Sequence, residues 1–467
     1  MEGPTPVSAV IHAAAMVSAG VYFLLRIFPL LAVAAGPEGN EGVAYVVALI
    51  GAFTAFMAAT IAISQYDVKG VLAYSTISQL GFMVAAIGIG GYVAGAFHLI
   101  AHGFFKALLF LASGSVIHGM EHGAHEVHDH HSDPQDMRNM GGLRKKMPIT
   151  FWTFLIGGLA LSGLPFFTSG FWSKDEIFAE AWHLWTQDGE ILPLLVFIML
   201  AAAAFLTAYY TMRQISLTFL GKPRTPLADN AHESNAFMTI PLMLLAFFAV
   251  TFGWSGIPET FPLIGPIVNN NYFHHLVGST IYELMDELYA LHLVDHPIES
   301  LPFYWQPLLA SLVVALGGLF LGWWIYGRKP LEAEEPDPVA APLGPLFVFL
   351  NHKWYVDEVY DRVFIKPTEF FSEKVVYQAV DKGVIDGILH AVARGFYGFG
   401  YYVKRFEEVV ISGGVDKLKD GFLNIANEFR QLQTGRVQEY ALISALIAVA
   451  LITVVLLINY GWFGQLF

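Results

Sequence analysis

The chain has 467 residues, of which 55% are hydrophobic and 14% charged, with a formal net charge of -14 at pH 7 and no cysteine. Soluble domains carry about 25% charged residues, so this composition indicates a polytopic membrane protein. The lack of cysteine excludes disulfides, thiolate metal sites and cysteine-held iron–sulfur clusters in this chain. The negative charge lies mostly in connections and in the C-terminal third, so it does not indicate a nucleic-acid partner.

Nine apolar runs are long enough to cross a bilayer. They cover about residues 7–33, 42–63, 70–89, 93–117, 148–182, 191–220, 236–255, 303–326 and 437–463. Lysine and arginine collect in alternate connections, which places residue 1, the His-rich segment after 117 and residues 328–436 on the cytoplasmic side. The predicted fold is therefore all-α and polytopic, with about nine transmembrane helices.

The fourth run carries three ionisable side chains at helical spacing. His98, His102 and Lys106 are related as i, i+4 and i+8, so they share one face of a helix. A lysine at mid-membrane depth costs about 2.5–3.5 kcal/mol to insert and usually faces a wet protein interior on an ion or proton route. A single histidine here would be a packing residue, but three ionisable groups on one stripe favour a proton route.

The fifth run, 148–182, is too long for one straight crossing, which takes about 20 residues. Its segment Leu161 to Pro165 contains a glycine and a proline, and an interior proline removes a backbone hydrogen bond. We therefore predict a discontinuous helix, a feature typical of transporters. Lys174, Asp175 and Glu176 follow the break and form a second charged cluster; the alternative for Lys174 is a snorkelling helix end.

Two segments outside the apolar runs have patterns of their own. Residues 331–345 read as a linker, and residues 346–436 mix apolar and charged residues at helical spacing, which predicts an amphipathic lateral helix on the cytoplasmic side. Residues 437–463 then form a final membrane anchor. The loop after the fourth run is histidine-rich, and we interpret it as a solvated insertion, with metal binding as the alternative. Its histidines are His118, His122, His125, His128, His130 and His131.

Several motifs resemble the antiporter-like subunits of respiratory complex I. They are Gly3 to Ser8 with Ile11 to Ala13, Asp67 to Gln79, Phe97 to Lys106, Met137 to Leu143, and Phe171 to Ile177. Residues Asn351 to Glu358 and the lateral helix resemble the distal subunit, L. The resemblance covers nearly the whole chain, with the motifs in the order the family has them.

The resemblance implies redox-driven proton pumping. It makes Lys106 the central relay, with His98 and His102 connecting to it, and assigns Lys174 and Asp175 to the exit side. It also places His12 between two halves of the subunit and Lys69 on the cytoplasmic uptake side. Family members have a preceding half with a glutamate–lysine pair. We therefore expect residues 1–33 to be the last helix of an absent N-terminal repeat.

The resemblance sets the remaining expectations. Residues 42–220 would be a second antiporter-like repeat, and residues 236–326 additional membrane helices. We expect no cofactor bound by this chain, contact with other membrane-arm subunits through residues 354–430, and a place in a bacterial inner membrane. Two alternatives stay open: a subunit of a multi-chain cation/proton antiporter, and a structural piece without transport activity.

Overall fold

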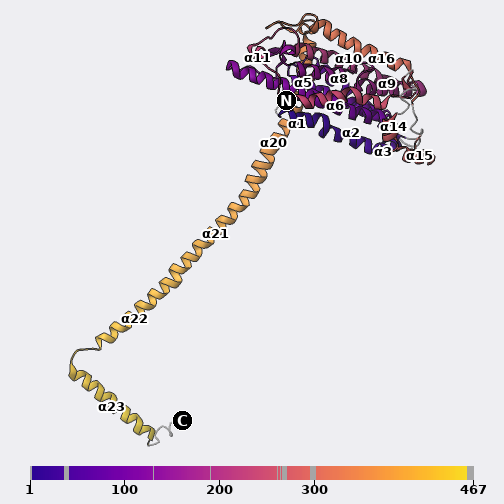
Figure 1. Cartoon of the computed structure of the whole chain (residues 1–467). Helices are drawn as coiled ribbons and strands as arrows, with labels where there is room; N and C mark the ends of the chain where they lie inside the picture. Colours follow the sequence, from indigo (N-terminus) through magenta and orange to yellow (C-terminus); the bar gives the residue numbers. More distant parts are fainter. Residues whose placement is uncertain are drawn as a thin grey trace. The chain divides into compact units, whose positions relative to one another are not determined.

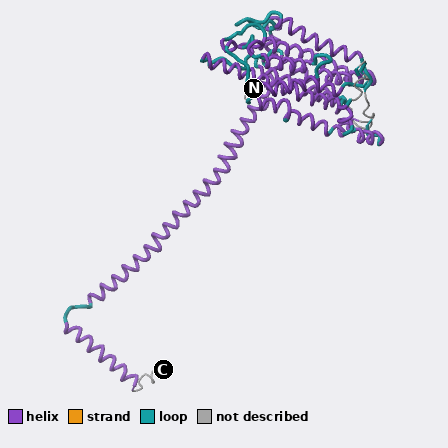
Figure 2. The backbone as a smooth tube through the Cα atoms, viewed as in Figure 1, coloured by secondary structure: helices purple, strands orange, loops and turns teal. Residues whose placement is uncertain are grey.

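The computed structural model describes residues 3–35, 42–129, 131–189, 191–259, 261–262, 264–265, 271–294 and 301–459. These residues form helices joined by turns, as Figure 2 shows, and the described part has no strand apart from an isolated bridge between Asp67 and Asp136. The chain divides into two units, Met1–Val356 and Asp357–Phe467, which we describe separately. The prediction of an all-α fold is confirmed.

Eight described helices are long and apolar enough to cross a membrane. Seven belong to the first unit (Figure 1): α1–η1–α2 (Thr5–Arg26), α4 (Gly42–Ala62), α5 (Val68–Gly88), α6 (Tyr92–Val127), α10 (Ile191–Phe219), α12–η3 (Ala236–Gly256) and α16–η4 (Trp305–Gly327). The eighth is α23 (Val437–Asn459) in the second unit. The predicted fifth span is not one of these eight, because it is divided into two shorter helices.

That span is discontinuous, as the sequence indicates. Helix α8 (Pro148–Ser162) ends at Gly163, which adopts a left-handed conformation with φ of 75°, and α9 (Ser169–Asp188) starts after a short turn. A left-handed residue is nearly free of strain only when it is glycine. Gly170 lets the two helices meet closely, because a Cβ there would lie 1.9 Å from the carbonyl oxygen of Ala160.

Small residues bring α4 and α5 into close contact. A Cβ on Gly81 would lie 2.5 Å from the backbone nitrogen of Ala55, and one on Gly51 would lie 2.4 Å from that of Ala85. Close backbone approach through glycine and alanine is a common way for membrane helices to pack. Asp67 caps α5, since its side chain accepts a hydrogen bond from the amide of Lys69. These contacts hold α5 against α4, and α5 also packs against α6, which carries the candidate site.

Two predicted boundaries were wrong. The first span does not reach residue 33, because the helix ends at Arg26, turns at Ile27 and resumes as α3 (Phe28–Ala35). The histidine-rich segment is not a loop throughout, because α6 continues to Val127 and ends at His128 with φ of 56°. The extension is stabilised by packing, since Gly123 lies against the backbone of Leu227. His118, His122 and His125 are therefore helical; His130 lies outside the described residues.

Shorter elements complete the first unit. They are η2 (Met137–Asn139), α7 (Leu143–Lys146), α11 (Pro226–Asp229), α14 (Tyr272–Gly278), α15 (Tyr282–Ala290), α17 (Ala340–Leu343), α18 (Pro345–Asn351) and η5 (Lys353–Tyr355). Trp354 donates a hydrogen bond to Thr60 and Asn351 donates one to the carbonyl of Ser64, so the segment after the linker is attached to the end of α4.

The second unit consists of a long amphipathic helix and α23. Helical segments follow one another without interruption from α19 (Val356–Tyr360) through η6 (Asp361–Ile365), α20 (Lys366–Phe370), η7 (Phe371–Ile385), α21 (Asp386–Phe406) and η8 (Glu407–Ser412) to α22 (Gly413–Gln431). A turn that contains Gly435, with φ of 69°, leads into α23.

Candidate functional site

Lys106 is fully buried on α6 and donates a hydrogen bond to Ser75 Oγ of α5 at 2.5 Å. The apolar side chains around it include Phe105 and Leu109 on the same helix, both also fully buried. A charge removed from water is costly unless polar groups surround it. A hydroxyl rather than a carboxylate accepts the hydrogen bond of Lys106, so a change in the protonation of this amine would not leave a buried carboxylate without its partner.

His98 and His102 extend the line from Lys106 along α6. Both are fully buried, and their ring centroids lie 6.4 Å apart. His98 contacts two other helices: Nδ1 lies 2.9 Å from Ser173 Oγ of α9, and Nε2 lies 3.2 Å from Gln79 Oε1 of α5. Both ring nitrogens of His102 are buried without a partner among the described residues. The predicted stripe is present, and its His98 end reaches α9.

Lys174 lies where the broken span exposes a backbone carbonyl. Its Nζ donates to the carbonyl oxygen of Leu161 at 2.5 Å and lies 5.5 Å from the ring centroid of Phe82. The last turn of any helix leaves carbonyl groups without intrahelical partners. The break at Gly163 therefore supplies the acceptor for Lys174. Ser173, the neighbour of Lys174 in the chain, contacts His98, which brings the stripe on α6 next to the residue that precedes Lys174.

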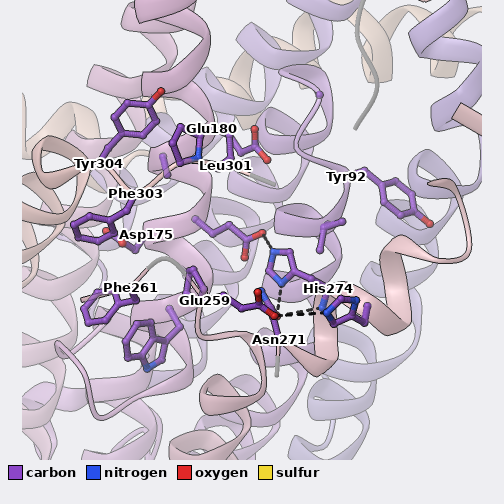
Figure 3. Close-up of a pocket in the computed structure, with 18 of the residues that line it drawn as sticks. Tyr92, Asp175, Glu180, Glu259, Phe261, Asn271, His274, Leu301, Phe303 and Tyr304 are labelled. Carbon is purple, nitrogen blue, oxygen red and sulfur yellow. Dashed lines mark hydrogen bonds and ion pairs between the residues drawn. The ribbon is translucent and has the colours of Figure 1, made fainter. Parts of the chain in front are cut away.

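Asp175 of α9 lines a cavity of about 390 Å³. Its Oδ1 accepts a hydrogen bond from Ser311 of α16 at 2.7 Å. The cavity is also lined by Glu176 and Glu180. Its other walls come from the connections that the lysine and arginine pattern places on the outer, non-cytoplasmic side of the membrane. Figure 3 shows Asp175, Glu180 and His274 around it.

His274 closes one wall of this cavity. Its Nε2 lies 2.6 Å from Glu176 Oε1, and its Nδ1 lies 2.6 Å from Asn271 Oδ1 (Figure 3). Burial disfavours the charged imidazole, but the negative charge of Glu176 and its hydrogen bond outweigh burial, so the pKa of His274 is raised above 6.5. The sequence interpretation placed Glu176 in the second charged cluster without giving it a role, and it did not single out Glu180 or His274. The spacing of the two glutamates, i and i+4 on α9, was the available signal.

The structure places His12 and Lys69 away from direct contact with this line. His12 lies in the π-helical turn η1 (Val10–Ala14) and stacks on Phe110, one turn beyond Lys106, with ring centroids 5.1 Å apart. Lys69 is buried at the start of α5 and donates a hydrogen bond to the carbonyl of Gly3 at 3.1 Å. Lys69 and Ser75 are six residues apart on α5, roughly 9 Å of helical rise.

A buried ion pair lies outside the predicted site. Arg213 of α10 contacts Asp337 of the linker at 2.8 Å, and both side chains are at most 3% exposed. Tyr326 donates to the second oxygen of Asp337 at 2.6 Å, and Arg213 donates to the carbonyl of Gln65 at 2.7 Å. The pair therefore holds the linker against the connection between α4 and α5. Sequence spacing gave no signal for it, since the two residues are 124 positions apart.

The histidines at the end of α6 do not form a metal site within the described residues. His118 and His122 have ring centroids 5.8 Å apart, and His122 lies 4.5 Å from His232 by the same measure. No group of three potential ligands is close enough to hold a metal ion in the described ranges.

Fold and site together define a multi-pass α-helical membrane protein with a buried line of lysine and histidine. Residues 1–187 match the family described as NADH:quinone oxidoreductase/Mrp antiporter, TM. This match includes Lys106, Lys174 and the break between α8 and α9.

Curated relatives match the chain over most of its length. It is 39% identical to NAD(P)H-quinone oxidoreductase chain 5 of Picosynechococcus sp., with 95% of this chain and 60% of the relative covered. It is 38% identical to F(420)H(2) dehydrogenase subunit L of Methanosarcina mazei, over 96% of this chain and 59% of the relative. NADH-quinone oxidoreductase subunit L of Rhodobacter capsulatus is 38% identical, with 85% of this chain and 59% of the relative covered. The chain thus spans about 60% of the length of these relatives.

Among solved structures, the chain is similar to one chain of the Mrp complex from Dietzia sp. The TM-score is 0.50 with 22% identity, and the alignment covers 97% of this chain and 38% of the other. At this identity the similarity concerns the fold alone.

Proposed function

We propose that this chain translocates protons across a bacterial inner membrane as a subunit of an NADH-quinone oxidoreductase, with electron transfer carried out by other subunits. The observation that carries the proposal is the buried line from Lys106 through His102 and His98 to Ser173 and Lys174. Relatives named as subunits L and chain 5 of such oxidoreductases support it.

The side chains have distinct parts in this proposal. Lys106 holds a proton in the centre of the line, and Ser75 accepts its hydrogen bond while the amine is charged. Each proton hop requires contact at hydrogen-bond distance, which His98 provides toward α9 through Ser173. Lys174 and Asp175 would serve the exit side, and Lys69 the uptake side.

His12 and the domain arrangement follow from the same proposal. His12 would be a polar residue at the edge of the second antiporter-like repeat, which residues 42–220 would form, with residues 236–326 as additional helices. Residues 354–430 would contact other membrane-arm subunits. The chain itself would bind neither the electron donor nor the quinone.

The experiment measures protons translocated per electron pair in native membranes. Lys106→Ala and Lys174→Ala should lower this ratio, because each removes an ionisable group from the line. Lys145→Ala is the control, since Lys145 is exposed at the end of α7. A wild-type ratio in both buried variants would refute the proposal.

A cation/proton antiporter subunit is the second candidate, because the matching family description names Mrp antiporters as well. Sodium-driven proton movement in vesicles without an electron donor would favour it. Proton movement that depends on the electron donor would favour the first proposal.

A further inference from the structure

Three observations meet at the cavity beyond Lys174 and Asp175. The cavity lies against α9 toward the outer side of the membrane, and it has a volume of about 390 Å³. The Glu176–His274 ion pair lies in its wall. Glu176 follows Asp175 directly in the chain, and both side chains line this space. A proton that reaches Asp175 therefore meets Glu176 and His274 next on the way outward.

The hydrogen bonds of His274 determine which nitrogen can exchange a proton. Asn271 Oδ1 accepts the backbone amide of His274 at 3.3 Å, so this atom is the oxygen of the amide group. The same oxygen lies 2.6 Å from His274 Nδ1, and so Nδ1 carries a hydrogen and donates it. In the neutral imidazole, Nε2 is then the acceptor, 2.6 Å from Glu176 Oε1.

Glu176 is arranged so that it can pass a proton to His274. Its side chain is 9% exposed, and Oε2 is buried without a hydrogen-bond partner among the described residues, while Oε1 contacts His274. His274 is 24% exposed, so its ring connects the buried carboxylate to the outer surface.

We propose, on the basis of the proposed proton translocation, that His274 is the proton-release residue of this chain and accepts each outgoing proton from Glu176. In this step the O–H bond of protonated Glu176 breaks and an N–H bond forms at His274 Nε2, which gives a carboxylate and an imidazolium. The N–H bond at Nε2 of the imidazolium then breaks, its proton passes to water at the outer surface, and the ring returns to the neutral state with Nδ1 still donating to Asn271. One proton enters the pair and one leaves.

Other titratable groups around His274 contribute to its environment. The acidic ones are Asp175, Glu176 and Glu180 of α9 and Glu259 of the segment after η3. The others that line the cavity are His275 of α14, Tyr282 of α15, Tyr92 of α6 and Tyr304 before α16. The geometry distinguishes His274 from His275, the other histidine in the cavity wall. His274 contacts a carboxylate of α9, whereas His275 lies 3.8 Å from Glu259 and is 74% exposed.

The test uses inverted vesicles from native membranes that contain the full assembly, so that the outer face of the chain faces the lumen. The lumen is buffered at values from pH 6 to 9 while the external pH stays constant, and the initial rate of donor-driven proton uptake is measured. The wild-type rate should show one inflection with luminal pH. His274→Gln keeps a polar side chain but cannot titrate in this range, so the inflection should disappear and the rate should fall on the order of 100-fold or more.

Matched variants make the result specific. His275→Gln should keep the wild-type profile. Glu176→Gln should give the same profile as His274→Gln. The double variant should match both single variants, because the two substitutions remove the same transfer step. Assembly is checked by native gel electrophoresis; if His274→Gln does not assemble, Glu176→Gln and the wild-type profile decide.

Two results would overturn the inference: a wild-type luminal pH profile in His274→Gln, or a wild-type rate without any inflection. Lys106→Ala measured in the same vesicles separates this from the proposed function. If Lys106→Ala stops pumping while His274→Gln leaves the profile unchanged, only the release residue is wrong. If Lys106→Ala pumps normally, the proposed function itself fails.

Discussion

Lys174 donates a hydrogen bond to the carbonyl oxygen of Leu161, 13 positions before it, across the break in the fifth span. The glycine that ends α8 thus creates the acceptor for a buried amine on α9. Proline and glycine in this span do more than interrupt a helix, because they place an unpaired carbonyl at the depth where a charged group needs a partner.

The contact between α8 and α9 should depend on Gly170. A methyl group there would overlap the carbonyl oxygen of Ala160, so Gly170→Ala should separate the helices, cost about 1–3 kcal/mol and displace Lys174. We expect less assembled protein and a lower proton ratio per electron pair. Gly20→Ala is the control, since nothing lies within 4 Å of its added Cβ. Equal effects of the two substitutions would contradict this account.

Ser75 should be needed to keep Lys106 functional. Ser75→Ala removes the hydroxyl that accepts the hydrogen bond of Lys106, and a buried donor left unsatisfied costs about 1–3 kcal/mol. The substitution should lower proton translocation more than donor oxidation with an artificial acceptor. Ser78→Ala on the same helix removes a hydroxyl that bonds to the carbonyl of Ala55 instead, and should leave the proton ratio near the wild-type value. The reverse order of effects would contradict the role given to Ser75.

The Arg213–Asp337 pair should hold the linker in place. Removing one partner of a buried ion pair typically costs about 3–5 kcal/mol, so Asp337→Ala should release the linker and speed trypsin cleavage after Arg328. Glu335→Gln, which loses a long and exposed pair with Lys329, should cleave at the wild-type rate. Unchanged cleavage in Asp337→Ala would show that other contacts hold this segment.

The same pair predicts a response to acid. Burial alone would raise the pKa of Asp337, but Arg213 and the hydrogen bonds of the carboxylate outweigh burial and lower it below 3.8. The stabilisation is therefore fully present above this ordinary value and is lost as the pH falls through the lowered pKa. Protease resistance of the linker, assayed after brief acid exposure, should fall with decreasing pH in the wild type and in Glu335→Gln. It should not depend on pH in Asp337→Asn, which has no carboxylate at this position. The same pH dependence in Asp337→Asn would show that another group controls it.

The Glu176–His274 pair predicts the opposite pH response. Because the pKa of His274 is raised, the stabilisation is fully present below its ordinary value of 6.5 and is lost as the pH rises through the raised pKa. Hydrogen exchange of the peptide containing α14, corrected for the intrinsic effect of pH, should therefore speed up at alkaline pH in the wild type. His274→Gln should exchange at one corrected rate across the range, and a wild type without any pH effect would contradict the prediction.

Much of the architecture could be predicted from local pattern. The apolar runs gave the spans, and the glycine and proline between Leu161 and Pro165 gave the discontinuity. The end of α6 could not be predicted, because Gly123 is helical through its contact with Leu227, more than a hundred positions later. The same limit applies to His274, whose importance depends on a carboxylate 98 positions earlier.

The sequence by itself determined that His98, His102 and Lys106 share one helical face, because the period of an α-helix is a local property of the backbone. It also determined that a second lysine follows a break in the fifth span. Only the tertiary structure decided what these groups contact: Ser75 for Lys106, Ser173 and Gln79 for His98, and the carbonyl of Leu161 for Lys174. Those partners come from other helices, and helix packing is set by side chains distant in sequence that close backbone contacts bring together.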